Sequence, residues 1–146
     1  MKASSTILAA CAVVLSAMTP ALAQDPEDYR ARQENLAKLA TIFGEMHHIR
    51  RMCEPRREAD AWRNRMKKLV ELEDPAASQR DVLVRAFNDG YSRAQKRYDI
   101  CSRSAEDYAA SRASEGERIV KALTDPLYES IEGDDAFPTV WRGGQR

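Results

Sequence analysis

The stretch GEMHHIRRMCEP, residues 44–55, holds side chains of the types that bind metal ions. His47 and His48 supply imidazoles and Cys53 a thiol, which are common ligands of zinc and copper. Neighbouring side chains on a helix point about 100° apart, so the two histidines do not converge readily on one small ion. We therefore expect no metal site here, and a site on His47 and His48 is the weaker alternative.

A second group of polar side chains lies in FNDGYSRAQKRYD, residues 87–99. Asn88 and Tyr91, together with His47 and His48, are candidates for a site between helices, which would make the protein an enzyme or a metal or cofactor carrier. The sequence lacks serine-nucleophile motifs, glycine-rich phosphate loops, CxxC and CxxCH. We assign no catalytic residue and no cofactor, and we favour a non-catalytic protein.

The run RRMCEPRREADAWRNRMKK, residues 50–68, carries eight Lys or Arg against three Asp or Glu. Arginine binds carboxylates and phosphates through paired hydrogen bonds, so this excess indicates an anion-binding surface. Charge runs on helices are often simply solvated, which is the alternative. We call the following six cations the basic face: Arg56, Arg57, Arg63, Arg65, Lys67 and Lys68.

The N-terminal segment MKASSTILAACAVVLSAMTPALA has the form of a secretory signal peptide. Its apolar run from Ile7 to Met18 is too short for a stable membrane span, and Ala21 and Ala23 give the small-x-small pattern that signal peptidase requires. We expect cleavage after Ala23, a periplasmic mature protein and no transmembrane anchor. The rival interpretation is a lipoprotein acylated at Cys11, but the apolar run continues well beyond that cysteine.

Removal of residues 1–23 leaves 123 residues, enough for one domain. We expect a helical bundle domain over residues 24–125 and an acidic, flexible tail over residues 126–146. The mature chain has 22 Lys or Arg against 23 Asp or Glu, and this lack of a basic excess argues against nucleic acid as a partner. The expected partner is an envelope protein or an anionic component of the envelope.

Between residues 26 and 125 the apolar residues recur at three- and four-residue steps, which is typical of amphipathic helices. Prolines and capping residues divide this segment into four predicted helices, at 27–53, 57–73, 77–101 and 104–125, the last capped by Ser104. Gly90 indicates either a break in the third helix or a close contact with another helix. The predicted fold class is all-α, an antiparallel bundle of about four helices with one disulfide.

Two cysteines remain after cleavage, Cys53 and Cys101, and a lone pair in an oxidising compartment usually forms a disulfide. In an up-down-up-down bundle they lie at the C-terminal ends of the first and third helices, which share one end of the bundle. A bridge closes a loop of about 48 residues and contributes about 4 kcal/mol in the chain-entropy model. A Cys53 in a disulfide cannot serve as a thiolate ligand of a metal. The alternatives to this bridge are free thiols or a disulfide between two chains.

The segments HHIRRMC, FNDGYSRAQKRYDIC and EGERI, together with the spacing of Trp62 and Met66, resemble a family of small secreted helical proteins of Gram-negative bacteria. The likeness spans residues 39–123. It implies a periplasmic helical domain with a cysteine pair, in a family that is itself of unknown function. The resemblance implies no activity, cofactor or catalytic residue.

Overall fold

The computed structural model describes residues 26–132, the last four as backbone only. Four helices make up this part of the chain: α1 (Pro26–Cys53), α2 (Ala61–Glu73), α3 (Ala77–Arg97) and α4 (Arg103–Glu132). The described residues contain no strand, and a disulfide joins Cys53 to Cys101, whose Cα atoms are 5.1 Å apart. The all-α, disulfide-linked fold is therefore confirmed, while the predicted signal peptide and residues 133–146 lie outside the described residues.

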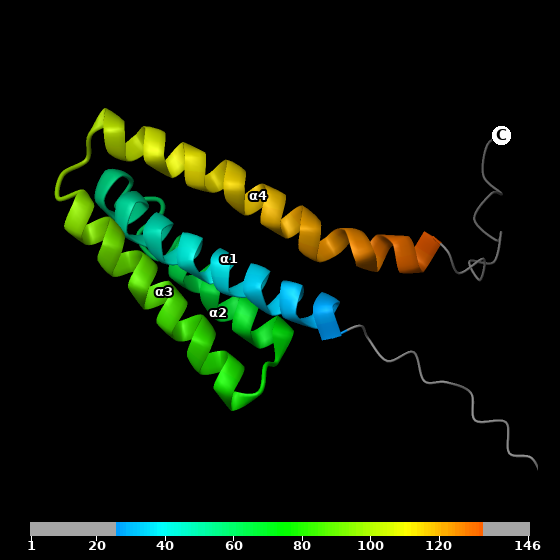
Figure 1. The fold of residues 1–146 in the computed structure, drawn as a ribbon. Coiled ribbons are helices and arrows are strands. Elements are labelled where there is room, and N and C mark those ends of the chain that lie inside the picture. The colour runs from blue at the N-terminus through cyan, green and yellow to red at the C-terminus, as the bar shows by residue number, and fades with distance from the viewer. Residues whose placement is uncertain (1–25, 133–146) are drawn as a thin grey trace, which may run out of the picture.

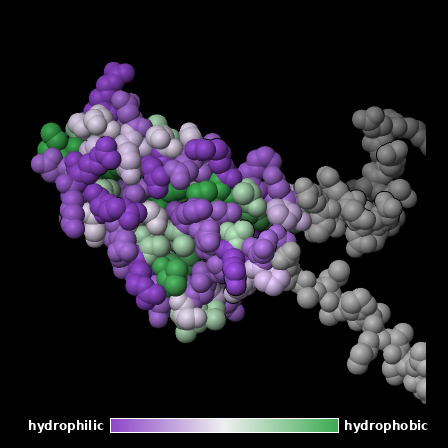
Figure 2. Space-filling view, viewed as in Figure 1, coloured by the Kyte–Doolittle hydropathy of each residue, from purple (hydrophilic) through white to green (hydrophobic). Residues whose placement is uncertain are grey.

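The α1 helix is the centre of the bundle. It lies between α3 and α4 in Figure 1 and also packs against α2. The α2 and α3 helices touch each other, whereas the backbone of α4 packs against α1 alone. Hydrophilic residues predominate on the face in Figure 2, with hydrophobic residues visible in small patches between them. Within residues 26–132, none of the helices has the length and apolar character needed to cross a membrane.

The central position of α1 explains why its middle is buried on nearly every side. An amphipathic helix at a protein surface buries one stripe, but α1 has neighbours in three directions. Its buried residues therefore include several outside any single stripe, and two of them are polar. The full set is Leu36, Leu39, Ala40, Ile42, Gly44, Glu45, Met46, His47 and Ile49.

Two glycines let the backbones of α1 and α3 touch. A Cβ atom at Gly44 would overlap the carbonyl oxygen of Phe87 and lie 2.8 Å from the backbone nitrogen of Tyr91. A Cβ atom at Gly90 would overlap the carbonyl oxygen of Thr41 in the same way. Gly90 therefore causes no break: α3 continues through it, and the close contact between helices accounts for both glycines.

Several helix ends differ from the predicted ones. The α2 helix begins at Ala61 rather than residue 57, because residues 54–60 form successive turns after Pro55. The α3 helix ends at Arg97 rather than residue 101, where Tyr98 turns to an extended conformation. Ser102, not Ser104, caps α4, since its hydroxyl accepts a hydrogen bond of 3.3 Å from the Ala105 N–H.

The C-terminal part of α4 also differs from the prediction. The helix continues through Pro126 to Glu132, so the predicted helix end at residue 125 is wrong and residues 126–132 belong to α4, while the rest of the predicted tail, residues 133–146, lies outside the described residues. Proline removes one backbone hydrogen bond, but a contact with α1 supports this segment: Arg32 donates a hydrogen bond of 3.4 Å to the Leu123 carbonyl. The axis of α4 turns near its orange end in Figure 1, as proline-containing helices commonly do.

Gly44→Ala should destabilise the protein by about 2 kcal/mol or more, because the new methyl group forces the α1 and α3 backbones apart. Gly116→Ala is the matched control: a Cβ there meets its nearest atom at 3.7 Å, so it should leave stability unchanged or raise it by up to about 1 kcal/mol. Urea unfolding of the oxidised proteins measures both. Equal effects of the two substitutions would contradict the proposed backbone contact.

Candidate functional site

The structure spreads the basic face over the α1–α2 connection and α2. Arg56 and Arg57 lie in the connection, the other four lie on α2, and all six are exposed. Two are paired with acids, Arg57 with Glu54 at 2.7 Å and Lys68 with Glu71 at 2.9 Å. The guanidinium of Arg65 lies 4.1 Å from the centre of the Trp62 ring.

The remaining three cations of the basic face are Arg56, Arg63 and Lys67. None of them has an ion pair with any residue in the range 26–128, whose side chains the structure describes. Arg63 and Lys67 are four residues apart on α2 and therefore on the same side of that helix. The surface thus keeps positive charge that its own neighbours do not neutralise.

The two adjacent histidines both lie beside the Tyr91 ring but differ in their other surroundings. His47 is 5% exposed, and its ring centre lies 5.7 Å from that of Tyr91. His48 meets the Tyr91 ring edge-on at 5.4 Å, and its Nε2 lies 2.7 Å from the carbonyl oxygen of Tyr98, to which it donates a hydrogen bond. The structure thus brings together three of the four residues of the alternative site, while Asn88 is exposed on α3.

Burial and nearby positive charge favour the neutral form of His47. Burial lowers the pKa of His47 below 6.5, and the charges of Arg51, Arg63 and His48 lower it further, while Asp60 opposes them. The Nδ1 atom of His47 is buried and has no hydrogen-bond partner in the described structure. A buried imidazole between aromatic rings is a packing element here, which agrees with its place in the α1–α3 interface.

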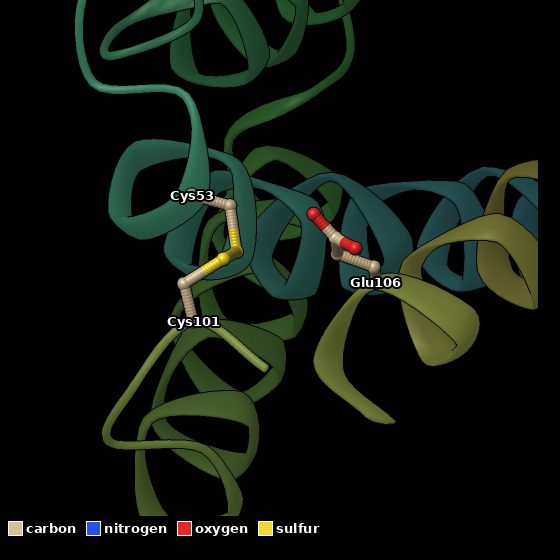
Figure 3. A group of neighbouring side chains, drawn as sticks. All are labelled: Cys53, Cys101 and Glu106. Atoms are coloured by element: carbon tan, nitrogen blue, oxygen red, sulfur yellow. A yellow bond between two sulfur atoms is a disulfide. The ribbon is translucent and has the colours of Figure 1, made fainter. Parts of the chain in front are cut away.

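One group of potential metal ligands does come together, at the disulfide. The Cys53 and Cys101 sulfurs and a carboxylate oxygen of Glu106 lie within 4.8 Å of one another, and the Glu106 side chain lies beside the sulfur pair in Figure 3. Metal binding by cysteine requires a thiolate, and both sulfurs are bonded to each other. The oxidised protein therefore offers only the single carboxylate at this position.

A buried carboxylate that the sequence pattern did not single out, Glu45, lies at the centre of the bundle. Its side chain is 4% exposed, and the Nε of Arg112 donates a hydrogen bond of 2.5 Å to its Oε2. Arg112 also pairs with Glu115 on its own helix, and Arg93 of α3 lies 3.6 Å from the other oxygen of Glu45. Charged groups leave water at a high free-energy cost unless they are paired in this way.

Tyr108 of α4 completes this buried group. Burial and the negative charge of the nearby Glu45 carboxylate raise the pKa of Tyr108. Glu45 thus links α1 to both α3 and α4. The signal in the sequence was an acidic residue three positions after Ile42 and four before Ile49, at core spacing. Its partners are too distant in sequence to have been inferred.

A groove lies beside this group, between α3 and α4. It has a volume of about 470 Å³, and we call it the α3–α4 groove. The guanidinium of Arg97 lies above the Tyr108 and Tyr98 rings, at 5.3 and 5.4 Å from their centres. The lining residues are Arg93, Ala94, Lys96 and Arg97 of α3 and Tyr108 of α4.

The residues described above lie within a known protein family. A family model described as a protein of unknown function, DUF2385, matches residues 31–126. The chain belongs to this family. Neither a curated protein nor a solved structure matches the chain.

The DUF2385 domain covers α1 from Ala31, all of α2 and α3, and α4 up to Pro126. It therefore contains both cysteines, the basic face, Glu45 with its partners and the α3–α4 groove. The resemblance to a family of unknown function is confirmed, over a longer segment than residues 39–123. Secretion and a Gram-negative origin stay predictions.

The folded DUF2385 protein should lose stability in mild acid through His47. Because the pKa of His47 is lowered on folding, the unfolded chain binds more protons than the folded one as the pH falls from 6.5 through the folded-state pKa. The free energy of unfolding should therefore decrease over that range. In His47→Phe, which keeps an aromatic ring beside Phe87 and Tyr91, this contribution is absent.

Urea unfolding at several pH values between about 5 and 7.5 measures the effect, since this range spans the ordinary histidine pKa. The stability of the wild type relative to His47→Phe should fall towards the acid end. Parallel pH profiles of the two proteins would contradict the assignment of a neutral, buried His47.

Proposed function

We propose that this DUF2385 protein is an exported, non-catalytic binding module that captures an anionic component of the cell envelope on its basic face. The supporting observation is the set of exposed cations Arg56, Arg63 and Lys67, which have no acidic partner among the side chains that the structure describes. Unpaired surface charge favours association with oppositely charged partners and speeds their encounter.

The composition of the basic face supports a large anionic partner. Arg65 is held over the Trp62 ring at 4.1 Å, so its guanidinium is positioned while its N–H groups remain exposed. No residue of the basic face lines the α3–α4 groove, and four of the six lie on one exposed helix. A polymer, a lipid surface or an acidic protein fits such a surface better than a small ligand does.

Export to the periplasm is supported by two independent features. The first 23 residues have the charge, apolar length and small-residue pattern of a signal peptide. The disulfide between Cys53 and Cys101 is a type of bond that persists in oxidising compartments. Both features support a periplasmic location for the chain from Gln24 onwards.

The alternative, an enzyme or a metal or cofactor carrier, has less support. It depends on His47, His48, Asn88 and Tyr91, and the first of these is buried among aromatic rings. His48 donates a hydrogen bond from its Nε2 to the backbone carbonyl of Tyr98, so this nitrogen is not free to bind a ligand. Purified protein that carries metal or a chromophore in stoichiometric amount would favour this alternative.

Charge reversal of the basic face should abolish capture of the partner. The test compares the wild type, the triple variant Arg56→Glu, Arg63→Glu and Lys67→Glu, and a control with the same charge change. The control reverses three exposed cations away from the basic face: Arg80, Arg85 and Arg118. Each tagged protein is crosslinked in an isolated envelope fraction and recovered, and the captured material is quantified.

Capture should fall at least about tenfold in the triple variant and stay near the wild-type level in the control, because only the former loses the binding surface. Equal capture by wild type and triple variant would contradict the proposal. Equal loss in both variants would show attraction by total charge rather than by the basic face.

The native protein should have the intact mass of residues 24–146 with one disulfide. Signal peptidase cleavage after Ala23 makes Gln24 the first residue, and the bridge removes two thiol hydrogens. Thiol alkylation before and after reduction, followed by intact-mass measurement, should detect two thiols only after reduction. An acylated species that begins at Cys11, or two free thiols before reduction, would contradict export as a soluble, oxidised protein.

A further inference from the structure

The α3–α4 groove has more positive than negative charge in and behind its walls. There are four cationic side chains and two carboxylates, and both carboxylates already pair with Arg112. Glu45 accepts a hydrogen bond from Arg112, and Glu115 pairs with Arg112. The cations are Arg93, Lys96, Arg97 and Arg112, and the carboxylates are Glu45 and Glu115.

Two of these cations, Lys96 and Arg97, have no ion pair with any of the side chains described between residues 26 and 128. Arg97 is nevertheless held in place, since its guanidinium lies over the Tyr98 and Tyr108 rings. Its side chain is exposed, so the guanidinium N–H groups remain available to a ligand while the rings lie beside it. It is therefore positioned to bind an oxyanion at little further entropic cost.

The groove combines these cations with an apolar floor. Ala94 is 2% exposed and Tyr108 is half-buried, so the apolar part of the lining lies deeper than the exposed charged side chains. Residues 93, 96 and 97 share one side of α3, where basic residues also stabilise the last turn of the helix. That effect explains cations on α3, but not the hollow that they form with α4. A volume of about 470 Å³ is that of a small-molecule site.

We propose that the α3–α4 groove binds a small molecule that carries a dianionic phosphate group. Lys96 and Arg97 bind the phosphate oxygens, Arg93 adds charge at the rim, and the Ala94 and Tyr108 floor contacts the organic part of the ligand. Two excess positive charges match a dianion, and a tetrahedral phosphate accepts hydrogen bonds from donors on several sides. This site is separate from the basic face and does not depend on the function proposed for that face.

The test uses the oxidised mature protein, labelled with ¹⁵N, and follows backbone NMR signals at constant ionic strength. The probes are phenyl phosphate, inorganic phosphate and benzoate, which has the same ring as the first probe but a monoanionic group. Phenyl phosphate should give saturable shifts at residues 93–97 and 108. Tighter binding of phenyl phosphate than of inorganic phosphate assigns the site to a phosphate ester, and equal binding assigns it to the free ion.

The double variant Lys96→Gln and Arg97→Gln should weaken binding of phenyl phosphate at least about tenfold, because it removes both oxyanion donors. The control Arg80→Gln and Arg85→Gln removes the same charge from exposed positions on the same helix and should bind as the wild type does. If circular dichroism shows reduced helicity in the double variant, Lys96→Gln alone serves, since that side chain is exposed.

Three results would overturn the proposal. The first is the absence of saturable shifts from either phosphate probe up to about 10 mM, which means no useful affinity. The second is benzoate binding as tightly as phenyl phosphate, which would assign the groove to carboxylates. The third is equal weakening in the double variant and the control, which would show only a response to net charge.

Discussion

Gly44 and Gly90 let the α1 and α3 backbones touch, and this contact sets the register of the two parallel helices. At this contact the backbones touch directly, so neither helix can shift along the other without a clash. The positions of the residues next to the two glycines are therefore fixed as well. Glu45 follows Gly44 and is brought to Arg93, while Tyr91 follows Gly90 and is brought to His47 and His48. The same register places the C-terminal ends of both helices together, where Cys53 and Cys101 are joined.

The packing of α4 against α1 combines apolar contacts with a buried ion pair. Its buried apolar residues are Ala105, Ala109 and Ile119, and the two alanines let the helix approach α1 closely while they add little buried apolar area. The pairing of Arg112 with Glu45 adds a directional contact, since a buried carboxylate without its partner is costly. Polar contacts of this kind define one position of α4 along α1 more sharply than alanine packing alone.

The helices and the disulfide could be predicted from the sequence, whereas the side-chain contacts between helices could not. Helix number follows from local spacing and prolines, and the disulfide follows from the cysteine count and the order of the helices, whereas Gly90 left a helix break and a close contact both open. The buried Glu45 and Arg112 are 67 positions apart, and nothing local indicates that they meet. The α3–α4 groove was missed for the same reason. The run through Pro126 was missed because a tertiary contact outweighs a helix-breaking preference.

The position of the disulfide also determines how the protein transmits mechanical tension. Residues 54–100, which include α2 and α3, lie inside the covalent loop closed by Cys53 and Cys101. A pull applied to the two chain ends passes from α1 directly through the sulfur atoms into α4. It can peel α4 from α1, but it cannot extend the enclosed segment while the bond is intact. The segment that carries the whole basic face is therefore outside the load path.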